Sequence, residues 1–419
     1  DIDVTCREIL ENLETLKQRL HGYVQEVREG FPRLYLLNEN DLLQFIGNCS
    51  NTEVLNLHIQ KIFLNVMSCG VHGGCVTHVV SNRINLESES VMLDSPVQLL
   101  GSDLEKTLPA LKEAMTRTLM ASLSSKIETL SQINLDLITR FKTLPYQVFL
   151  LLLQIQFSKE FFSSIKSMQT DSMRDRILGL IHDITKLIYN EPTSKQSERH
   201  RHTCMFLISF ISVLDEICNN NSNRSWIIFK TVMFKYLPCE TGKSDKSAMK
   251  LMDVSMNLAG HKISYSWEYQ GLKAPLVYTH VTEKMFVSFA RSLYEIKGTN
   301  LVGPAGTGKT ETVKFFGSLL GKFILVFNCD ENIGMNTVTS IFKSFVTEDA
   351  FLCLDEFNRF NQEQLSLVSQ TIQNIQFLIR SNFNGVPFVL KNVENFQKLN
   401  SGCAIFTTMN PKSLAYSSR

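Results

Sequence analysis

Residues 301–310 read LVGPAGTGKT, and this stretch decides the fold of the C-terminal part of the chain. It joins the end of an apolar strand to a G-x-x-x-x-G-K-T loop, and a predicted helix over residues 311–320 follows. Glycines in such a loop let backbone N–H groups turn toward phosphate oxygens, and the helix N-terminus adds the positive end of its dipole. The pattern therefore predicts a P-loop. The residues expected to contact the nucleotide are Gly303, Pro304, Ala305, Gly306, Thr307, Gly308, Lys309, Thr310 and Glu311.

Two of these side chains are expected to act on the phosphates directly. Lys309 is expected to reach the β- and γ-phosphates of ATP, where its charge assists catalysis. Thr310 is expected to be a ligand of Mg²⁺ through its hydroxyl oxygen. The predicted cofactors are therefore ATP and Mg²⁺.

A second motif, FLCLDE at residues 351–356, is an apolar strand that ends in two carboxylates, the Walker B arrangement. Asp355 is expected to help hold the Mg²⁺, and Glu356 is expected to orient and deprotonate the attacking water. Alone, such a run is usually a strand that enters a solvated loop. Downstream of a P-loop, the catalytic interpretation is favoured, and the Asp-Glu pair points to AAA+ ATPases rather than small GTPases or nucleotide kinases.

A third apolar strand, AIFTTMN at residues 404–410, ends in an amide. AAA+ proteins place a sensor residue there that touches the γ-phosphate or the water, so Asn410 is predicted to have this catalytic role. Alone, an Asn before Pro411 is more often part of a turn. Apolar strands at 324–327, 351–354 and 404–407 alternate with helical stretches, which predicts a parallel α/β sheet.

The N-terminal half has a different pattern. Residues 1–240 are predicted to be mainly α-helical, with a short extended stretch over 76–86. Polar runs at 191–202 and 238–246 are loop candidates. The predicted division is a helical region 1–240, a connector 241–264 and an α/β P-loop domain 265–419. The apolar positions with helical spacing are Ile9, Leu13, Leu16, Leu20, Leu119, Leu123, Ile127 and Leu130.

The composition excludes several classes of protein. Lys and Arg number 42 against 41 Asp and Glu, so no bulk charge attracts nucleic acid. The longest apolar run, 148–153, is too short to span a membrane and is expected to belong to a buried helix. Ten cysteines without a C-x-x-C pair favour a reduced, cytosolic setting. Because the sequence begins with Asp1 rather than Met, we expect a fragment.

Three stretches give the motifs a family resemblance: GPAGTGKTET at 303–312, LVFNCDE at 325–331 and DEFNR at 355–359. Together they resemble the first AAA module of dynein heavy chains. The family's adenine-packing segment is similar to YQG at 269–271 and LVYT at 276–279, which implies adenine contacts from Leu276 and Val277.

The resemblance extends to the N-terminal region and to a subtype. FPRLY at 31–35 and DLL at 41–43 resemble the dynein linker, so the likeness covers nearly the whole chain. WEYQG at 267–271 and LLG at 319–321 look most similar to the cytoplasmic dynein 2, or intraflagellar-transport, subtype. The cytoplasmic dynein 1 subtype is the alternative, and axonemal heavy chains fit less well.

Three departures put the adenine pocket and the sensor geometry in question. HVTE at 280–283 stands where the family usually has PLTD, and KGT at 297–299 stands where it usually has Gly-Gly. After MNP at 409–411, KSLAY replaces a glycine-rich stretch.

The resemblance implies a function for the whole molecule. Residues 1–240 would be the C-terminal part of the linker, and ATP hydrolysis would drive its stroke in a minus-end-directed microtubule motor of retrograde intraflagellar transport. The implied partners are the other ring modules and the intermediate, light-intermediate and light chains, with microtubules bound only through regions outside this chain. The implied locations are the cytoplasm, the cytoskeleton and the cilium.

The chain is expected to lack the helical lid and the neighbouring module's arginine finger, so we expect weak binding and little turnover from this piece alone. A non-catalytic nucleotide-binding remnant, or a protein that binds dynein subunits, is the alternative. An unrelated P-loop helicase or kinase lacks support, because neither a basic nucleic-acid face nor an arginine cluster is visible.

Overall fold

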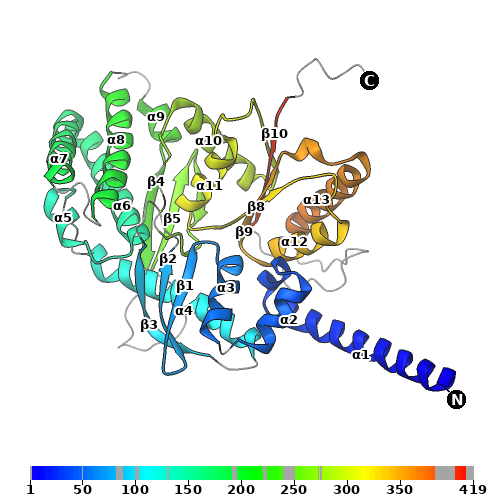
Figure 1. Ribbon diagram of the computed structural model, residues 1–419. Helices are drawn as coiled ribbons and strands as arrows, with labels where there is room; N and C mark the ends of the chain where they lie inside the picture. Colours follow the sequence, from blue (N-terminus) through cyan, green and yellow to red (C-terminus); the bar gives the residue numbers. More distant parts are fainter. Residues whose placement is uncertain are drawn as a thin grey trace.

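The structure is a computed structural model that describes residues 2–49, 51–81, 88–99, 103–128, 130, 132–190, 196–219, 224–238, 251–271, 273, 276–382 and 402–411. In Figure 1, helices with small antiparallel sheets lie beside a parallel sheet that carries helices on both faces. The first helix, α1 (Ile2–Gly30), projects away from the body. The predicted fold, a mainly α-helical region followed by an α/β P-loop domain, is confirmed.

The parallel sheet positions the predicted site. Within the described residues it has four strands in the order β7-β10-β9-β8. Each neighbouring pair is parallel, so the carboxyl ends of the strands lie along one edge. The three strands predicted from the sequence are β8, β9 and β10. The strand bounds are β7 Thr299–Val302, β8 Phe323–Asn328, β9 Ala350–Asp355 and β10 Ala404–Met409.

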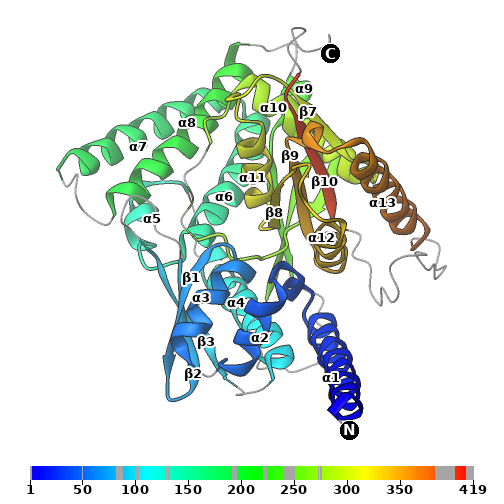
Figure 2. The same ribbon diagram turned by 45° about the vertical axis from the view of Figure 1, so that its right-hand side comes forward.

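Alternating side chains bury both faces of this sheet. Phe351 and Phe406 point to one face, where Phe351 stacks on Phe316 of α11. Leu352 and Leu354 point to the other face and pack with α12 and α13. Figure 2 shows α11 and α12 on opposite sides of the strands. The covering helices are α10 His280–Tyr294, α11 Lys309–Leu319, α12 Met335–Thr347 and α13 Gln362–Asn382.

The N-terminal part is built mainly of helices, as predicted. The stripe of apolar residues predicted around Leu119 is buried and lies in α4 as far as Ile127, while its last residue, Leu130, lies beyond the end of the helix. The stripe predicted around Leu13 lies in α1, where Leu13 is 56% exposed. A 3₁₀ turn, η1 (Pro32–Leu36), follows α1. The helices are α2 Glu39–Gly47, α3 Thr52–Ile62, α4 Leu104–Ile127, α5 Leu135–Arg140, α6 Tyr146–Ser167, α7 Thr170–Asn190, α8 Ser197–Asn219 and α9 Arg224–Lys230.

Two antiparallel sheets correct the prediction of a helical array. In the first, β2 (Cys75–Ser81) confirms the start of the predicted extended stretch, whose end at 82–86 lies outside the described residues. Its partners β1 (Val66–His72) and β3 (Ser90–Gln98) were not predicted. The burial pattern of β1 does not alternate cleanly, and β3 contains Pro96, a residue disfavoured within strands. The second sheet has β4 (Met233–Pro238) at one edge.

The predicted connector 241–264 is also corrected. Its described part contains β5 (Met252–Leu258) and β6 (His261–Ser264), which extend the sheet that begins with β4. The predicted loop 191–202 is wrong over its second half, because residues 197–202 form the start of α8. Its first half, and the polar run after Pro238, lie outside the described residues.

Among the residues that the structure describes, two helices, α6 and α8, are long and apolar enough to cross a membrane by length and composition. In α6, 67% of the most apolar window is buried inside the protein, and in α8 the buried share is 56%. Buried core helices pass the same test. The prediction that residues 148–153 belong to a buried helix is confirmed, since this run lies within α6.

Candidate nucleotide-binding site

The loop between β7 and α11 has the backbone of a phosphate cradle. Gly306 and Gly308 have φ angles of +76° and +74°, which glycine adopts without steric cost. A Cβ at either position would meet nothing within 4 Å, so both glycines border open space. Gly308 is the N-cap of α11 and no side chain caps this end, so its first N–H groups are available to an anion. The residues therefore fit a bound phosphate.

Lys309 lies at the base of this loop and is 9% exposed. Its Nζ donates to the carbonyl oxygens of Gly303, at 2.8 Å, and Pro304, at 2.7 Å. It also donates to Asn410 Oδ1 at 3.0 Å. The structure thus brings the predicted P-loop lysine and the predicted sensor amide together across the edge of the sheet.

Thr310 and Asp355 form a cluster of oxygen atoms beside the loop. Thr310 Oγ1 donates to Asp355 Oδ1 at 2.9 Å, and Thr408 Oγ1 donates to the same carboxylate oxygen. Hydroxyl and carboxylate oxygens are the ligands that Mg²⁺ prefers, and a protein site usually supplies only one or two of them. The predicted metal ligands therefore fit a magnesium ion that also contacts a nucleotide.

Glu356 follows Asp355 in the left-handed region, with φ +54°, which is uncommon for a residue with a side chain. Its N–H donates to Thr408 Oγ1 at 3.1 Å. Its carboxylate accepts from Asn410 Nδ2 at 3.4 Å and pairs with Arg359 Nε at 2.5 Å. Arg359 ends the short 3₁₀ turn η3 (Phe357–Arg359). The turn directs the predicted general base toward the sensor amide.

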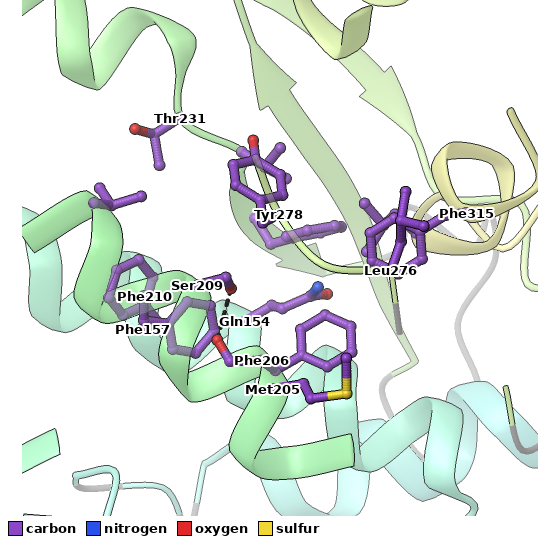
Figure 3. A pocket seen from close by; sticks show the side chains of 14 residues that line it. Gln154, Phe157, Met205, Phe206, Ser209, Phe210, Thr231, Leu276, Tyr278 and Phe315 are labelled. Carbon is purple, nitrogen blue, oxygen red and sulfur yellow. Dashed lines mark hydrogen bonds between the residues drawn. The ribbon is translucent and has the colours of Figure 1, made fainter. Parts of the chain in front are cut away.

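The two predicted adenine contacts do not share a face. Leu276 lines an apolar pocket together with side chains of α6, α8 and α11, as Figure 3 shows. Val277 is 64% exposed. Leu276 and Tyr278 line the pocket and Val277 between them does not, so the Val277 side chain points away from it. Of this pair, Val277 is the residue open to an adenine, and Leu276 belongs to the pocket behind it.

Glu311, the last predicted contact, is a surface residue of α11 that pairs with Lys314 at 2.7 Å. Its side chain is 62% exposed. The remaining predicted residues, 304–307, form the exposed rim of the loop. Thr307 Oγ1 closes this rim by donating to the Pro304 carbonyl at 2.9 Å.

Sequence reasoning missed Thr408 and Arg359. Thr408 lies within the quoted strand motif TTMN, but an apolar strand gives no reason to single out one buried hydroxyl. Arg359 lies within DEFNR, and its position three residues after Glu356 is the signal that could have found it. Both residues hold the Walker B carboxylates in place.

The site lies within a region that matches a known family. Residues 265–418 match the family described as the hydrolytic ATP binding site of the dynein motor region. Residues 2–126 match the N-terminal region 2 of dynein heavy chains. The strands, the P-loop and the Walker B turn described above all fall within the first of these matches.

Whole-chain comparisons agree. Cytoplasmic dynein 2 heavy chain 1 of Caenorhabditis elegans is 31% identical over 99% of this chain, and its human counterpart is 30% identical over 98%. The cytoplasmic dynein heavy chain of Dictyostelium discoideum is 27% identical over 98%. The chain spans 9% of the length of each of these relatives. On the two domain matches and these relatives together, the chain belongs to the dynein heavy chain family.

Proposed function

We propose that this chain is the ATP-hydrolysing first AAA+ module of a dynein motor heavy chain, with part of its linker attached. The observation that carries the proposal is the convergence of Lys309, Thr310, Asp355, Glu356 and Asn410 at one edge of the parallel sheet. These residues come from three separate motifs, and each has the chemistry that phosphoryl transfer to water requires.

Each residue has a distinct task. The P-loop N–H groups and Lys309 bind and orient the phosphates. Thr310 and Asp355 would hold Mg²⁺, which would supply positive charge to neutralise the phosphates. Glu356 accepts the proton of the attacking water. Asn410 joins the two ends of the site, because its oxygen accepts from Lys309 while its nitrogen donates to Glu356.

In the larger molecule, the helical region 1–240 would serve as the C-terminal part of the linker, residues 241–264 as its connection, and residues 265–419 as the module's α/β part. Nucleotide-dependent movement of this module would drive minus-end-directed motion on microtubules. The ring modules and the intermediate, light-intermediate and light chains would be its partners. The support is the family membership and the likeness in the linker region.

The names of the relatives bear on the subtype. Cytoplasmic dynein 2 heavy chains match at 31% (Caenorhabditis elegans) down to 27% (Chlamydomonas reinhardtii), and the Dictyostelium and Drosophila cytoplasmic dynein heavy chains match at 27% and 28%. The names of the relatives with the higher identities support retrograde intraflagellar transport as the proposed role, with location in the cytoplasm, the cytoskeleton and the cilium. A cytoplasmic dynein 1 type is the second candidate.

The site assignment is tested with the 419-residue chain, a fluorescent ATP analogue and single-turnover hydrolysis. Lys309→Ala removes the charge-assisted contact, so we expect nucleotide affinity to fall at least about tenfold. Glu356→Gln keeps the shape but removes the base, so binding stays within about twofold while hydrolysis falls about 100-fold. Lys314→Ala, one turn along the same helix, is the control. Unchanged binding by Lys309→Ala would refute the assignment.

The larger context is tested separately, because arginine fingers supplied by neighbouring modules contribute about 10³–10⁵ in rate. We expect little multiple-turnover hydrolysis from the isolated chain, and hydrolysis at motor-like rates would contradict this. An antibody against a peptide from residues 380–400 then gives the size of the native polypeptide. A species of several hundred kilodaltons supports the motor, whereas a band near 47.7 kDa supports a nucleotide-binding remnant.

A further inference from the structure

An apolar pocket lies between the helical part and the α/β part, behind the extended segment 276–279 (Figure 3). The centre of a water-sized sphere can occupy about 50 Å³ of it. This is several times the roughly 10–15 Å³ that one water needs on this measure. A second cavity shares Gln154, Phe206, Phe315 and Leu319 with it, so the two adjoin.

Aromatic rings form most of the wall. Phe157 of α6 stacks on Phe210 of α8, with ring centroids 3.9 Å apart. Phe206 of α8 approaches Phe315 of α11 at 6.1 Å, and Tyr278 stands above them in Figure 3. Flat walls of this kind favour a flat aromatic occupant, since rings gain most from offset-stacked and edge-to-face contacts.

Gln154 is the amide that this wall presents to the pocket. Its side chain extends from α6 toward Phe206 and Phe315 in Figure 3, and the residue is 9% exposed. Among the described residues, its amide has no hydrogen-bond partner. The hydroxyls of Ser209 and Thr231, by contrast, both donate to helix carbonyl oxygens. The amide lines the pocket, so both of its polar atoms are available to an occupant.

A second buried glutamine of α6, Gln147, has a structural role and serves as a comparison for Gln154. Gln147 lies seven residues earlier, on the same face of α6, and it is also buried. Its Nε2 donates to Tyr265 Oη at 2.7 Å and to the Glu268 carbonyl at 2.8 Å, and its Oε1 accepts from Gln270 N at 2.8 Å. Gln147 therefore joins the two parts of the molecule, whereas Gln154 presents its amide to the pocket.

We propose that this pocket binds a small planar aromatic molecule of one or two rings, whose edge carries a hydrogen-bond donor beside an acceptor. That edge pairs with both polar atoms of the Gln154 amide. The rings pack among Phe157, Phe206 and Phe315. The combination of an apolar lining with one directional polar group is typical of small-molecule sites.

The position of the pocket links it to the nucleotide. Leu276 and Tyr278 line the pocket, while Val277 between them is exposed on the other side. Phe315 belongs to α11, whose N-terminus is the P-loop. An occupant therefore contacts the segment and the helix that border the proposed nucleotide site. We expect this contact to change the affinity of the chain for nucleotide. This second step rests on the proposed function, whereas binding in the pocket does not.

The experiment uses 7-azaindole as the probe, because its adjacent N–H and ring nitrogen match a carboxamide. Binding to the 419-residue chain is measured by calorimetry and by ligand-observed NMR. Gln154→Met keeps the volume but removes the amide, so we expect about tenfold weaker binding of 7-azaindole. Indene has the same shape without nitrogen, so we expect it to bind the parent chain and Gln154→Met equally.

Ser209→Phe fills the pocket and is expected to abolish 7-azaindole binding, while Ile208→Phe places the same side chain at the exposed neighbouring position and is expected to leave it unchanged. No binding by the parent chain overturns the proposal, and so does equal binding by Ser209→Phe, since the probe would then lie elsewhere. Equal 7-azaindole affinity of Gln154→Met and the parent chain also overturns it. Gln154→Met retains a buried, unbranched side chain, so it still tests the proposal if Ser209→Phe does not fold.

The link to the nucleotide is read from the affinity of the fluorescent ATP analogue with and without saturating 7-azaindole. We expect a change of at least about threefold, and its loss in Ser209→Phe. Unchanged nucleotide affinity, with 7-azaindole bound, overturns the link. If the chain without 7-azaindole binds no nucleotide, the proposed function is overturned instead, and the result on 7-azaindole binding in the pocket is unaffected.

Discussion

At the scale of single residues, Thr408 is the side chain that links the Asp355 carboxylate to the backbone of Glu356. It is 1% exposed. Its hydroxyl donates to Asp355 and accepts from the Glu356 N–H at 3.1 Å. Because Glu356 has a positive φ, its backbone needs such a partner to stay in the left-handed region. Thr408 thus positions both the proposed metal ligand and the proposed base.

Thr408→Val keeps the shape of this side chain and removes both hydrogen bonds. We expect the free energy of unfolding to fall by about 1–3 kcal/mol, since two partly buried partners lose their contacts. Nucleotide affinity is expected to stay within about twofold, while single-turnover hydrolysis falls about tenfold. Thr407→Val is the matched control, because the Thr407 hydroxyl bonds to Asn300 at 3.0 Å, away from the carboxylates. Equal hydrolysis by the two variants would refute the positioning role.

Lys273 makes stability depend on pH. Burial, assisted by the nearby positive charge of Lys314, lowers its pKa from 10.5 to about 8. Between these values the unfolded chain holds this proton and the folded chain does not, so the contribution of Lys273 to the free energy of unfolding rises with pH. The destabilising effect is fully present below pH 8 and disappears above 10.5.

Lys273→Met is therefore expected to be more stable than the parent chain below pH 8, with the advantage shrinking toward pH 10.5. Urea unfolding at several pH values measures the difference, and the other titrating groups contribute equally to both proteins. A difference that does not change with pH would show that the Lys273 pKa is unshifted.

At the scale of elements, the packing of α11 on the sheet depends on a glycine. A Cβ at Gly317 would lie 2.6 Å from side-chain atoms of Ile324 in β8 and 3.1 Å from Phe351 in β9. The absent side chain lets the P-loop helix lie close to the strands that carry the Walker B motif. The close approach thus fixes how the phosphate loop stands relative to Asp355.

Gly317→Ala and Gly179→Ala make the same change in two helix interiors. Gly179 lies on the exposed face of α7 with nothing within 4 Å of an added Cβ, so we expect a gain of about 0.5–1 kcal/mol in unfolding free energy from helix propensity. Gly317→Ala is expected to lose about 1–3 kcal/mol, since overpacking outweighs that gain. Urea denaturation compares them, and stabilisation by both would disprove the close packing.

At the scale of the whole molecule, a buried ionic network ties the helical part to the α/β part. Arg33, 1% exposed, donates to both carboxylate oxygens of Glu268 at 2.7 and 2.8 Å and to Glu348 at 3.2 Å. Lys112 of α4 also bonds to Glu348. The guanidinium lies 4.1 Å from the ring centroid of Phe323, the first residue of β8. The predicted linker and the predicted module therefore share a continuous interior.

Arg33→Met leaves two carboxylates buried without their main partner. We expect the free energy of unfolding to fall by about 3–5 kcal/mol, as is typical when one member of a buried ion pair is removed. Arg117→Met removes an exposed pair with Glu113 on α4 and is expected to cost less than about 1 kcal/mol. Chemical denaturation measures both, and similar small losses would show that the network does not join the two parts.

Much of the α/β part could be predicted because its signals are local. The P-loop, the Asp-Glu pair and Asn410 each follow an apolar strand, and parallel strands bring such ends to one edge whatever the rest of the chain does. The helical periodicity of α1 and α4 was equally readable. By contrast, residues 197–202 look like a polar loop, yet they begin α8, where Arg199 packs over the Tyr146 and Phe149 rings.

The sequence by itself therefore determined the family and the α/β fold, and it predicted the residues proposed to bind and hydrolyse ATP, since each depends on short stretches whose chemistry is fixed by residue type and spacing. Only the tertiary structure decided that Thr408 links Asp355 to the backbone of Glu356, that Leu276 faces a pocket while Val277 faces solvent, and that Arg33 meets Glu268 and Glu348. The physical reason is that these contacts join residues far apart in the chain. Their formation depends on how whole elements pack, and no local pattern records that packing.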